Sequence, residues 1–143
     1  MTYRFLDGIA MADVAFEATG ENLAELFVAA SDATINTMID SIDGILPKTS
    51  RKIQLRNGQL DLLLFDFLQE LIYYKDADGL LLRVPQVEIE QQGDEFRLAA
   101  TGFGEEFDPT RHEPRSDVKA VTLHQFTVER TPEGWRCLVI LDV

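Results

Sequence analysis

The stretch that most limits the possible folds is the last part of the chain, where residues 135–143 read Trp-Arg-Cys-Leu-Val-Ile-Leu-Asp-Val. The unbroken apolar run at 137–141 predicts a buried strand that continues to the C-terminus. Such a strand sets the side-chain carboxylate of Asp142 beside the α-carboxylate of Val143. Both groups supply the anionic oxygens that hard cations prefer, and Asp13 near the N-terminus is the best candidate for the other half of a site. The alternative is that Asp142 is only a solvated strand end.

The composition fits a single domain over residues 1–143, because 45% of the residues are hydrophobic and a chain of this length can enclose a core. The formal net charge is −12, from 25 acidic and 13 basic residues. This balance argues against direct nucleic acid binding, which needs clustered Lys and Arg. It suits a soluble protein that binds cations or docks on a basic partner surface.

Two further features of the composition concern cellular location and redox chemistry. The longest apolar run, at residues 62–65, is too short to cross a bilayer, and the N-terminal residues lack the regions of a signal peptide. We therefore expect a cytoplasmic protein without membrane contacts. Cys137 is the only cysteine, which excludes an internal disulfide and a cluster of thiolate metal ligands. Its position in the last apolar strand predicts a core residue.

Helix signals fall in the first half of the chain and strand signals mostly in the second, which predicts the α+β class. Asn22 and Glu25 have the spacing of a capping box, which begins a helix that runs to about residue 38. A second helix is expected over about residues 60–74, and its apolar character on all sides predicts burial on more than one side. Strands are expected at residues 14–20, 51–56, 81–91, 95–103, 118–130 and 135–142. The predicted architecture is two helices packed on one or more mainly antiparallel sheets.

The loop over residues 107–114 reads Phe-Asp-Pro-Thr-Arg-His-Glu-Pro, a mixture of charged side chains of the kind that functional loops carry. His112 lies among carboxylates and has the chemistry of a metal ligand or of a base. The alternative is that Arg111 and Glu113 form a surface ion pair while the prolines stiffen the loop. His124, in the strand that follows, is expected to be a packed strand residue.

Lys119 lies in the same expected strand, where alternation sets it on the face opposite Val118 and Ala120. On the core side it would need an anionic partner, whereas in water it needs none, and the sequence leaves both possibilities open. The pair Gly102 and Gly104 is not a phosphate loop, because it lacks the Gly-Lys-Ser/Thr ending and opens no helix. The sequence contains no nucleophile-elbow, zinc-hydrolase or paired-cysteine motif. We therefore expect no enzyme activity of its own.

The run at residues 107–114, followed by Val-Lys-Ala-Val-Thr-Leu-His at 118–124, resembles the signature of the archease family. Archeases show Asp-Pro-x-Arg-His, then Val-Lys-Ala-Val-Thr-x-His, then a short hairpin that ends in Asp and an aliphatic residue, as residues 141–143 do. The start of the chain is also similar, at Tyr-Arg-Phe-Leu-Asp (3–7), Ala-Asp-Val (12–14) and Leu-Ala-Glu-Leu-Phe (23–27). The resemblance covers essentially the whole chain, and the 108–124 stretch is its specific part.

The resemblance implies an accessory protein, not an enzyme, whose partner is an RtcB-type RNA ligase. That ligase joins RNA ends with GTP and manganese through a guanylylated histidine. Archeases are understood to promote the guanylylation and the multiple turnover of this ligase, in tRNA splicing or RNA repair. The expected partner is therefore the RtcB-type RNA ligase, with no direct nucleic acid binding and no organic cofactor.

The resemblance also implies a metal site formed by three residues: Asp13, Asp142 and Val143. This agrees with the interpretation of the C-terminus above. Oxygen ligands favour a divalent cation such as calcium, magnesium or manganese over zinc. Lys119 matches the lysine of the Val-Lys-Ala motif, near that site, where it would balance the charge of the aspartates or touch the ligase. Arg111 and His112 belong to the same signature and are expected among the functional residues.

One segment departs from the family pattern. Many archeases read Asp-His-Thr-Ala-Asp before the strand, whereas residues 7–13 here read Asp-Gly-Ile-Ala-Met-Ala-Asp, two residues longer and without that His. The loop that carries Asp13 can therefore reach the C-terminus by a different path, which leaves the identity and affinity of the metal open. Two other functions also stay open. One is an acidic, chaperone-like binding module for basic client proteins, and the other is a small metal-dependent hydrolase with His112 as its base.

Overall fold

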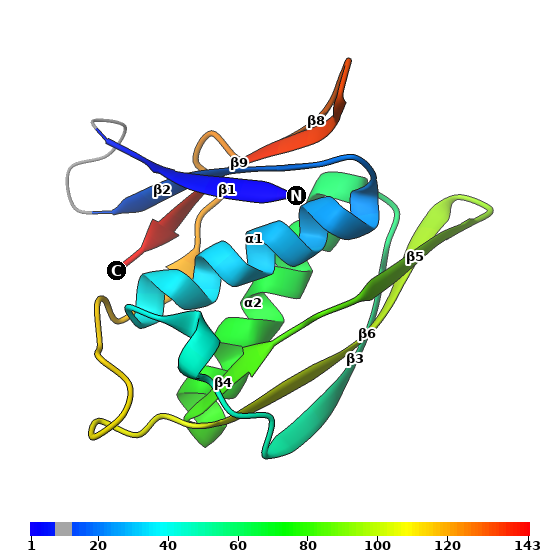
Figure 1. The fold of residues 1–143 in the computed structure, drawn as a ribbon. Helices are drawn as coiled ribbons and strands as arrows, with labels where there is room; N and C mark the ends of the chain where they lie inside the picture. The colour runs from blue at the N-terminus through cyan, green and yellow to red at the C-terminus, as the bar shows by residue number, and fades with distance from the viewer. Residues whose placement is uncertain (8–12) are drawn as a thin grey trace.

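The computed structural model describes residues 1–7 and 13–143, which form two antiparallel sheets with two helices between them (Figure 1). The elements in chain order are β1 (Thr2–Leu6), β2 (Val14–Gly20), α1 (Leu23–Met38), the 3₁₀ turn η1 (Ile42–Gly44), β3 (Thr49–Asn57), α2 (Leu60–Asp78), β4 (Leu80–Arg83), β5 (Val87–Gln92), β6 (Glu95–Glu106), β7 (Ala120–Val121), β8 (Thr127–Thr131) and β9 (Gly134–Asp142). Helix α1 packs mainly on β2, and α2 packs on β3 and β4. This arrangement confirms the predicted α+β class.

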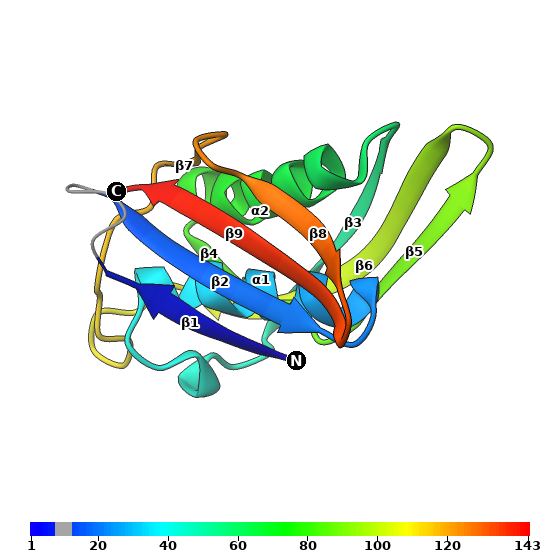
Figure 2. The same cartoon turned by 90° about the horizontal axis from the view of Figure 1, so that it is seen from above.

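The last strand is the centre of the first sheet, which is called the β9 sheet below. Strand β2 pairs along one edge of β9, while β8 and β7 pair one after the other along its opposite edge (Figure 2). Cys137, Val139 and Leu141 are fully buried, so the predicted buried strand and the predicted core cysteine are confirmed. In the second sheet, called the β6 sheet, β3 pairs on one edge of β6, and β5 and β4 pair on the other.

Helix α1 begins at the predicted cap and is the more deeply buried of the two helices. The Glu25 N–H donates to Asn22 Oδ1 over 2.9 Å, which confirms the first bond of the capping box. In the second bond Glu25 Oε1 accepts from the N–H of Glu21 over 3.2 Å, one residue before the expected N–H of Asn22. Ser31, Thr34 and other small residues of α1 let both sheets approach closely. Their hydroxyls donate to carbonyls one turn back, so no buried polar group is left without a partner there.

Helix α2 contacts strands of both sheets, which confirms the predicted burial on more than one side. It continues four residues beyond the predicted end at Tyr74 and stops at Gly79, whose φ of 67° forms a left-handed cap. The added turn is polar, so the apolar periodicity does not include it. Neither helix of the described residues is long and apolar enough to cross a membrane.

The structure differs from the predicted strands at three places, two in the β6 sheet and one at the N-terminus. Residues 81–91 form not one strand but two, because Pro85 interrupts the ladder; β4 and β5 then pair with separate parts of β6. Strand β1, which pairs with β2, was not predicted. The predicted strand at 95–103 continues to Glu106, so Glu105 lies in a strand and not in the loop.

The prediction of a long strand over residues 118–130 is wrong. Only Ala120–Val121 and Thr127–Thr131 pair with β9, and a tight turn separates them. In that turn Gln125 has a φ of 54°, a left-handed conformation that usually calls for Gly or Asn. Because the turn uses Gln, the sequence carries no turn signal there. His124, predicted to be a packed strand residue, is exposed in this turn.

Candidate functional site

The end of the β9 sheet brings together segments that lie far apart in the sequence. Val14 pairs with Leu141, so Asp13 enters the sheet directly beside the last residues of β9. On the opposite edge Ala120 pairs with Asp142, and the Lys119 N–H donates to the Asp142 carbonyl over 2.8 Å. Asp142 and Val143 are therefore bordered on one side by the start of β2 and on the other by the start of β7.

The burial of these residues shows how the chain end is held. Leu141 is fully buried, and alternation sets the side chain of Asp142 on the opposite face of β9. Val143 packs against the core, which anchors the main chain at the C-terminus. Asp13 and Asp142 are half-buried, while Lys119 is exposed. The question left open by the sequence is thus answered: Lys119 faces water and not the core.

The donor chemistry at this end of the sheet is restricted to oxygen. Within the described residues no three His, Cys, Asp or Glu side chains gather closely enough to hold a metal ion. A cation between Asp13 and Asp142 would therefore need further donors besides such side chains, for example a main-chain oxygen, a water or the predicted carboxylate of Val143. Such donors are all oxygen, which suits hard divalent cations. Residues 8–12, which include the departure from the family pattern, lie outside the described residues.

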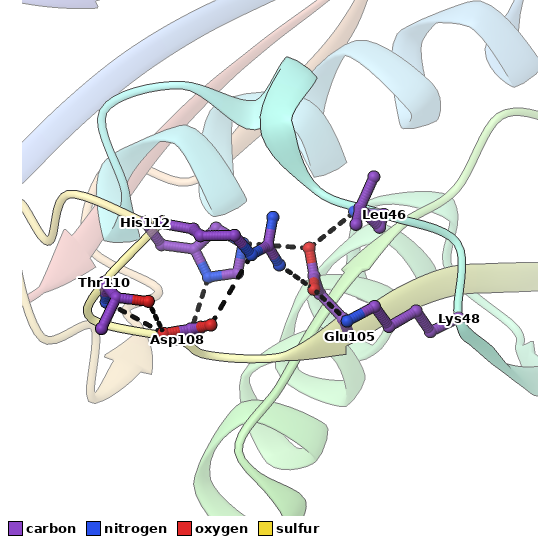
Figure 3. A network of polar contacts seen from close by, with 7 residues as sticks. Leu46, Lys48, Glu105, Asp108, Thr110 and His112 are labelled. Atoms are coloured by element: carbon purple, nitrogen blue, oxygen red, sulfur yellow. Dashed lines mark hydrogen bonds and ion pairs between the residues drawn. The ribbon is translucent and has the colours of Figure 1, made fainter.

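The loop signature at residues 108–112 forms a second polar cluster, centred on Glu105 of β6 (Figure 3). Glu105 is only 3% exposed. Its Oε2 accepts from the Leu46 N–H over 2.7 Å and lies 3.0 Å from His112 Nε2. Its Oε1 forms ion pairs with Arg111 and with Lys48, the latter over 3.5 Å. The hydrogen bond from Arg111, followed by those from Leu46 and His112, outweighs burial and lowers the pKa of Glu105 from 4.5 to about 2.

His112 is part of this cluster, and its two ring nitrogens are both engaged. Nδ1 accepts the Asp108 N–H over 2.9 Å, so this nitrogen carries no proton. The proton of the neutral ring therefore lies on Nε2 and is donated to Glu105. With its side chain only 1% exposed, His112 presents no lone pair to a metal or a substrate in this arrangement.

Arg111 lies beside His112 and has a different partner from the one predicted. The prediction of a surface ion pair between Arg111 and Glu113 is wrong, because Arg111 pairs with Glu105 and with Asp108. Asp108 also accepts the N–H and the hydroxyl of Thr110, over 2.9 and 2.6 Å. Arg111 and His112 thus fasten the loop to the β6 sheet and do not reach toward the end of β9.

The segment between the loop and β7 is fixed by polar side chains of α2. Lys75 Nζ donates to the Val118 carbonyl over 2.7 Å and pairs with Asp117 over 2.8 Å. The Val121 N–H donates to Gln69 Oε1 over 2.6 Å. These contacts fix the main chain before and after Lys119. Gln69, Lys75 and Glu105 are structural contributors that the sequence analysis did not find. The partners of Gln69 and Lys75 lie far away in the chain, as does Leu46, one of the partners of Glu105.

Two antiparallel sheets around a pair of helices, with a carboxylate-rich end at the last strand, define a small α+β protein of the helix-between-sheets type. The solution structure of Methanobacterium thermoautotrophicum protein 1598 has this fold, with a TM-score of 0.81, 28% identity and coverage of 99% of this chain and 98% of that one. A Thermotoga maritima protein described as "an archease, possible chaperone" shares the fold with a TM-score of 0.61 at 20% identity, over 94% and 93% of the two chains.

The sequence comparisons identify the family. The sequence model of the Archease protein family (MTH1598/TM1083) matches residues 3–143. "Protein archease" of Pyrococcus furiosus is 35% identical over 133 residues, which cover 92% of this chain and 93% of the relative. "Protein archease" of Methanosarcina mazei is also 35% identical, over 92% and 90%. The chain belongs to the archease family, and the resemblance seen in the sequence is confirmed.

Proposed function

We propose that this protein is an accessory factor that promotes guanylylation and multiple turnover of an RtcB-type, GTP-dependent RNA ligase in tRNA splicing or RNA repair. It does not join RNA itself in this proposal. The observation that carries the proposal is the meeting of Asp13, Lys119 and the Asp142–Val143 terminus at one end of the β9 sheet, in a chain of the archease family. The excess of acidic residues supports a protein partner with a basic surface.

In this proposal the carboxylates of Asp13, Asp142 and Val143 hold a divalent cation: calcium, magnesium or manganese. In the proposal Lys119 supports the site through the hydrogen bond from its N–H to the Asp142 carbonyl, and its exposed charge lies at the surface that meets the ligase. When bound, the cation would supply positive charge that a ligase phosphate or carboxylate can contact. The residues of this chain bind it, orient it and set it at the surface that meets the ligase.

The test is a ligation assay with a purified RtcB-type ligase, GTP, manganese and a cleaved RNA, with and without this protein. We expect the wild type to convert single turnover into multiple turnover and to raise the fraction of guanylylated ligase. Asp142→Ala should lose this effect and keep the fold. Asp94→Ala is a matched control, because Asp94 lies in the exposed turn between β5 and β6. Full stimulation by a well-folded Asp142→Ala protein would exclude the proposed site.

A second candidate is an acidic, chaperone-like module that covers basic client proteins. The net charge of −12 favours it, and the Thermotoga maritima relative carries the description "possible chaperone". This function rests on diffuse charge, so its effect should weaken steadily with salt and survive Asp13→Ala. The proposed accessory function predicts the opposite for that variant, because one ligand of the cation is lost.

A further inference from the structure

The outer face of the β6 sheet, which points away from the helices, is only partly covered. Figure 1 shows both helices on the opposite face of this sheet, between it and the β9 sheet. At the end of β6, Glu105 and the segments that bind it cover the outer face. Before that point the alternate residues Arg97, Ala99 and Phe103 of β6 are exposed, and the Phe103 ring is 39% exposed. An open sheet face that carries a large apolar ring is a candidate contact surface.

Two adjoining grooves run along the middle of this face. The first, of about 400 Å³, extends from Ala99 to Phe103, and the second, of about 440 Å³, extends from Ala99 to Arg97. Both grooves are also lined by Gln54 of β3 and Glu88 of β5. The face is therefore hollow along β6, because the central residue is small and the side chains on the two flanking strands are long.

The two flanking strands carry opposite charges. On β3 the exposed residues Lys52 and Arg56 are basic, and on β5 the exposed residues Glu88 and Glu90 are acidic. Strand register sets Arg56, the central Arg97 and Glu90 side by side in one row across the sheet. One side of the groove is thus basic and the other side is acidic.

The row at Arg56 is not satisfied within one chain. Arg56 has the like-charged Arg97 as its direct cross-strand neighbour, and such a pair destabilises a sheet. The ion pairs of the described residues include Arg97 with Glu95, over 3.5 Å, but neither Arg56 nor Glu90. With Glu95, the exposed part of the face has equal numbers of basic and acidic residues. It is therefore electrically neutral in a chain whose net charge is −12.

A neutral face with one basic and one acidic side is complementary to a copy of itself. In a symmetric dimer the same patch meets on both chains. A twofold axis along β6 sets Arg56 opposite Glu90 of the second copy, and symmetry repeats this pair. Face-to-face sheets lie about 10 Å apart, which a long Arg–Glu pair spans. Arg97 meets its own copy near the axis, where Glu95 offsets its charge. Lys52 forms no such pair, because its row has no acidic residue on β5.

We propose that the protein forms a homodimer through the outer face of the β6 sheet, with Arg56 and Glu90 in reciprocal ion pairs and Phe103 as the apolar contact near the axis. Two chains of charge −12 repel each other elsewhere, and this neutral patch lets them approach. An interface of three short strands per chain is at the small end of specific interfaces, so we expect a Kd of roughly 10 µM. The inference goes beyond the proposed function and does not depend on it, because Asp142 lies in the other sheet.

The test is sedimentation velocity of the purified protein from about 1 to about 200 µM, a range that brackets the expected Kd. Arg56→Glu and Glu90→Arg each place two like-charged pairs in the interface, so each should weaken dimerisation by at least roughly 10-fold. Phe103→Ser should also weaken it, through the lost apolar contact. An equimolar mixture of Arg56→Glu and Glu90→Arg should form a heterodimer with wild-type affinity, because both reversed pairs are then complementary again.

The net charge provides an internal control. Glu90→Arg makes the chain less acidic, so general repulsion between chains predicts stronger association, whereas the proposed interface predicts weaker association. The mixture has the same net charge as two wild-type chains, so its recovery reports on local pairing. Glu133→Arg is the matched control, since Glu133 is exposed in the turn between β8 and β9, and it should keep the dimer. Circular dichroism and thermal unfolding verify that each variant is folded.

The outcomes decide the inference without reference to the ligase. A wild type that stays monomeric at about 200 µM would overturn it. If either charge variant dimerises as well as the wild type, or if Glu90→Arg associates more strongly, the chains meet through another surface and the inference fails. It also fails if the mixture remains monomeric. The accessory function is judged separately, by ligation with Asp142→Ala, so that one proposal can fail while the other stands.

Discussion

Glu105 and Asp142 are both acidic residues at the end of a long strand, one in each sheet, yet their surroundings are opposite. Glu105 is buried, and each of its oxygens has two partners: Leu46 and His112 on one, Arg111 and Lys48 on the other. Asp142 is half-buried on the outer face of β9, and the bond to Lys119 uses its main-chain carbonyl, not its carboxylate. Every oxygen of the first cluster's carboxylate has partners, and the cluster stabilises the fold, whereas the second is the place where we propose that a cation binds.

The family signature therefore has two parts with different structural roles. The Asp-Pro-x-Arg-His part closes on Glu105 and holds the loop against the β6 sheet. The Val-Lys-Ala part is bound by Lys75 of α2 and pairs with the edge of β9. Changes in the first part should therefore act on the free energy of unfolding, and changes in the second on stimulation of the partner.

The largest effect on stability is expected at Glu105. Glu105→Gln removes the charge that Arg111 and Lys48 neutralise, and breaking a buried ion pair in this way costs about 3 kcal/mol of unfolding free energy. Urea unfolding of the variant measures this value. Glu106→Gln is the matched control, because Glu106 is the neighbouring, exposed residue of β6. If the unfolding free energy of Glu105→Gln changed by less than about 1 kcal/mol, the cluster would behave like surface ion pairs and would not stabilise the fold.

The same cluster should give the protein a specific acid sensitivity. Because the pKa of Glu105 falls from 4.5 in the unfolded chain to about 2 in the fold, its contribution to stability is present above pH 4.5 and is lost between pH 4.5 and 2. The difference in unfolding free energy between the wild type and Glu105→Gln should therefore shrink over this interval. A difference that stays constant down to pH 2 would contradict the ionised state of Glu105.

The two regions also differ in how far the sequence could predict them. The sequence predicted that Asp142 lies at a strand end, because the unbroken apolar run at residues 137–141 indicates a buried strand. The first polar residue after this run marks the end of that strand. Glu105 was missed because the predicted strand stopped at Phe103, and because its partners include Leu46, which is 59 residues away. Hydrogen bonds over such distances depend on the packing of sheets and leave no local pattern.

The surroundings of Lys119 show a second limit of the sequence. Alternation continues from Val118 to Arg130, so a single strand was expected, and the turn at Gln125 breaks it without Gly, Pro or Asn. The pairing of Ala120 with Asp142 follows from that turn and from the contacts of Gln69 and Lys75 with the segment. The family resemblance predicted Lys119 near the C-terminal site, and the structure shows the contact, a hydrogen bond from the Lys119 N–H to the Asp142 carbonyl.

A much smaller effect on stability is expected at Lys119, together with a large effect on stimulation. Lys119 is exposed, so Lys119→Met should change the unfolding free energy by less than about 0.5 kcal/mol. If its charge supports the proposed site, the variant should stimulate the ligase at least roughly 10-fold less, which corresponds to about 1.4 kcal/mol of lost stabilisation of the active complex. Lys52→Met, an exposed lysine of β3, is the control. Equal stimulation by both variants would remove Lys119 from the site.

The smallest effect on stability is expected from one glycine added after Val143. The side chain of Val143 stays packed against the core, so unfolding in urea should be unchanged within about 0.5 kcal/mol. The added residue nevertheless moves the terminal carboxylate by about 3.5 Å, which is longer than a metal–oxygen bond. Stimulation of the ligase and binding of calcium or manganese, measured by calorimetry, should both fall sharply. If the extended protein binds the cation as well as the wild type does, Asp13 and Asp142 hold it without the chain end, and the site must contain a donor other than Val143.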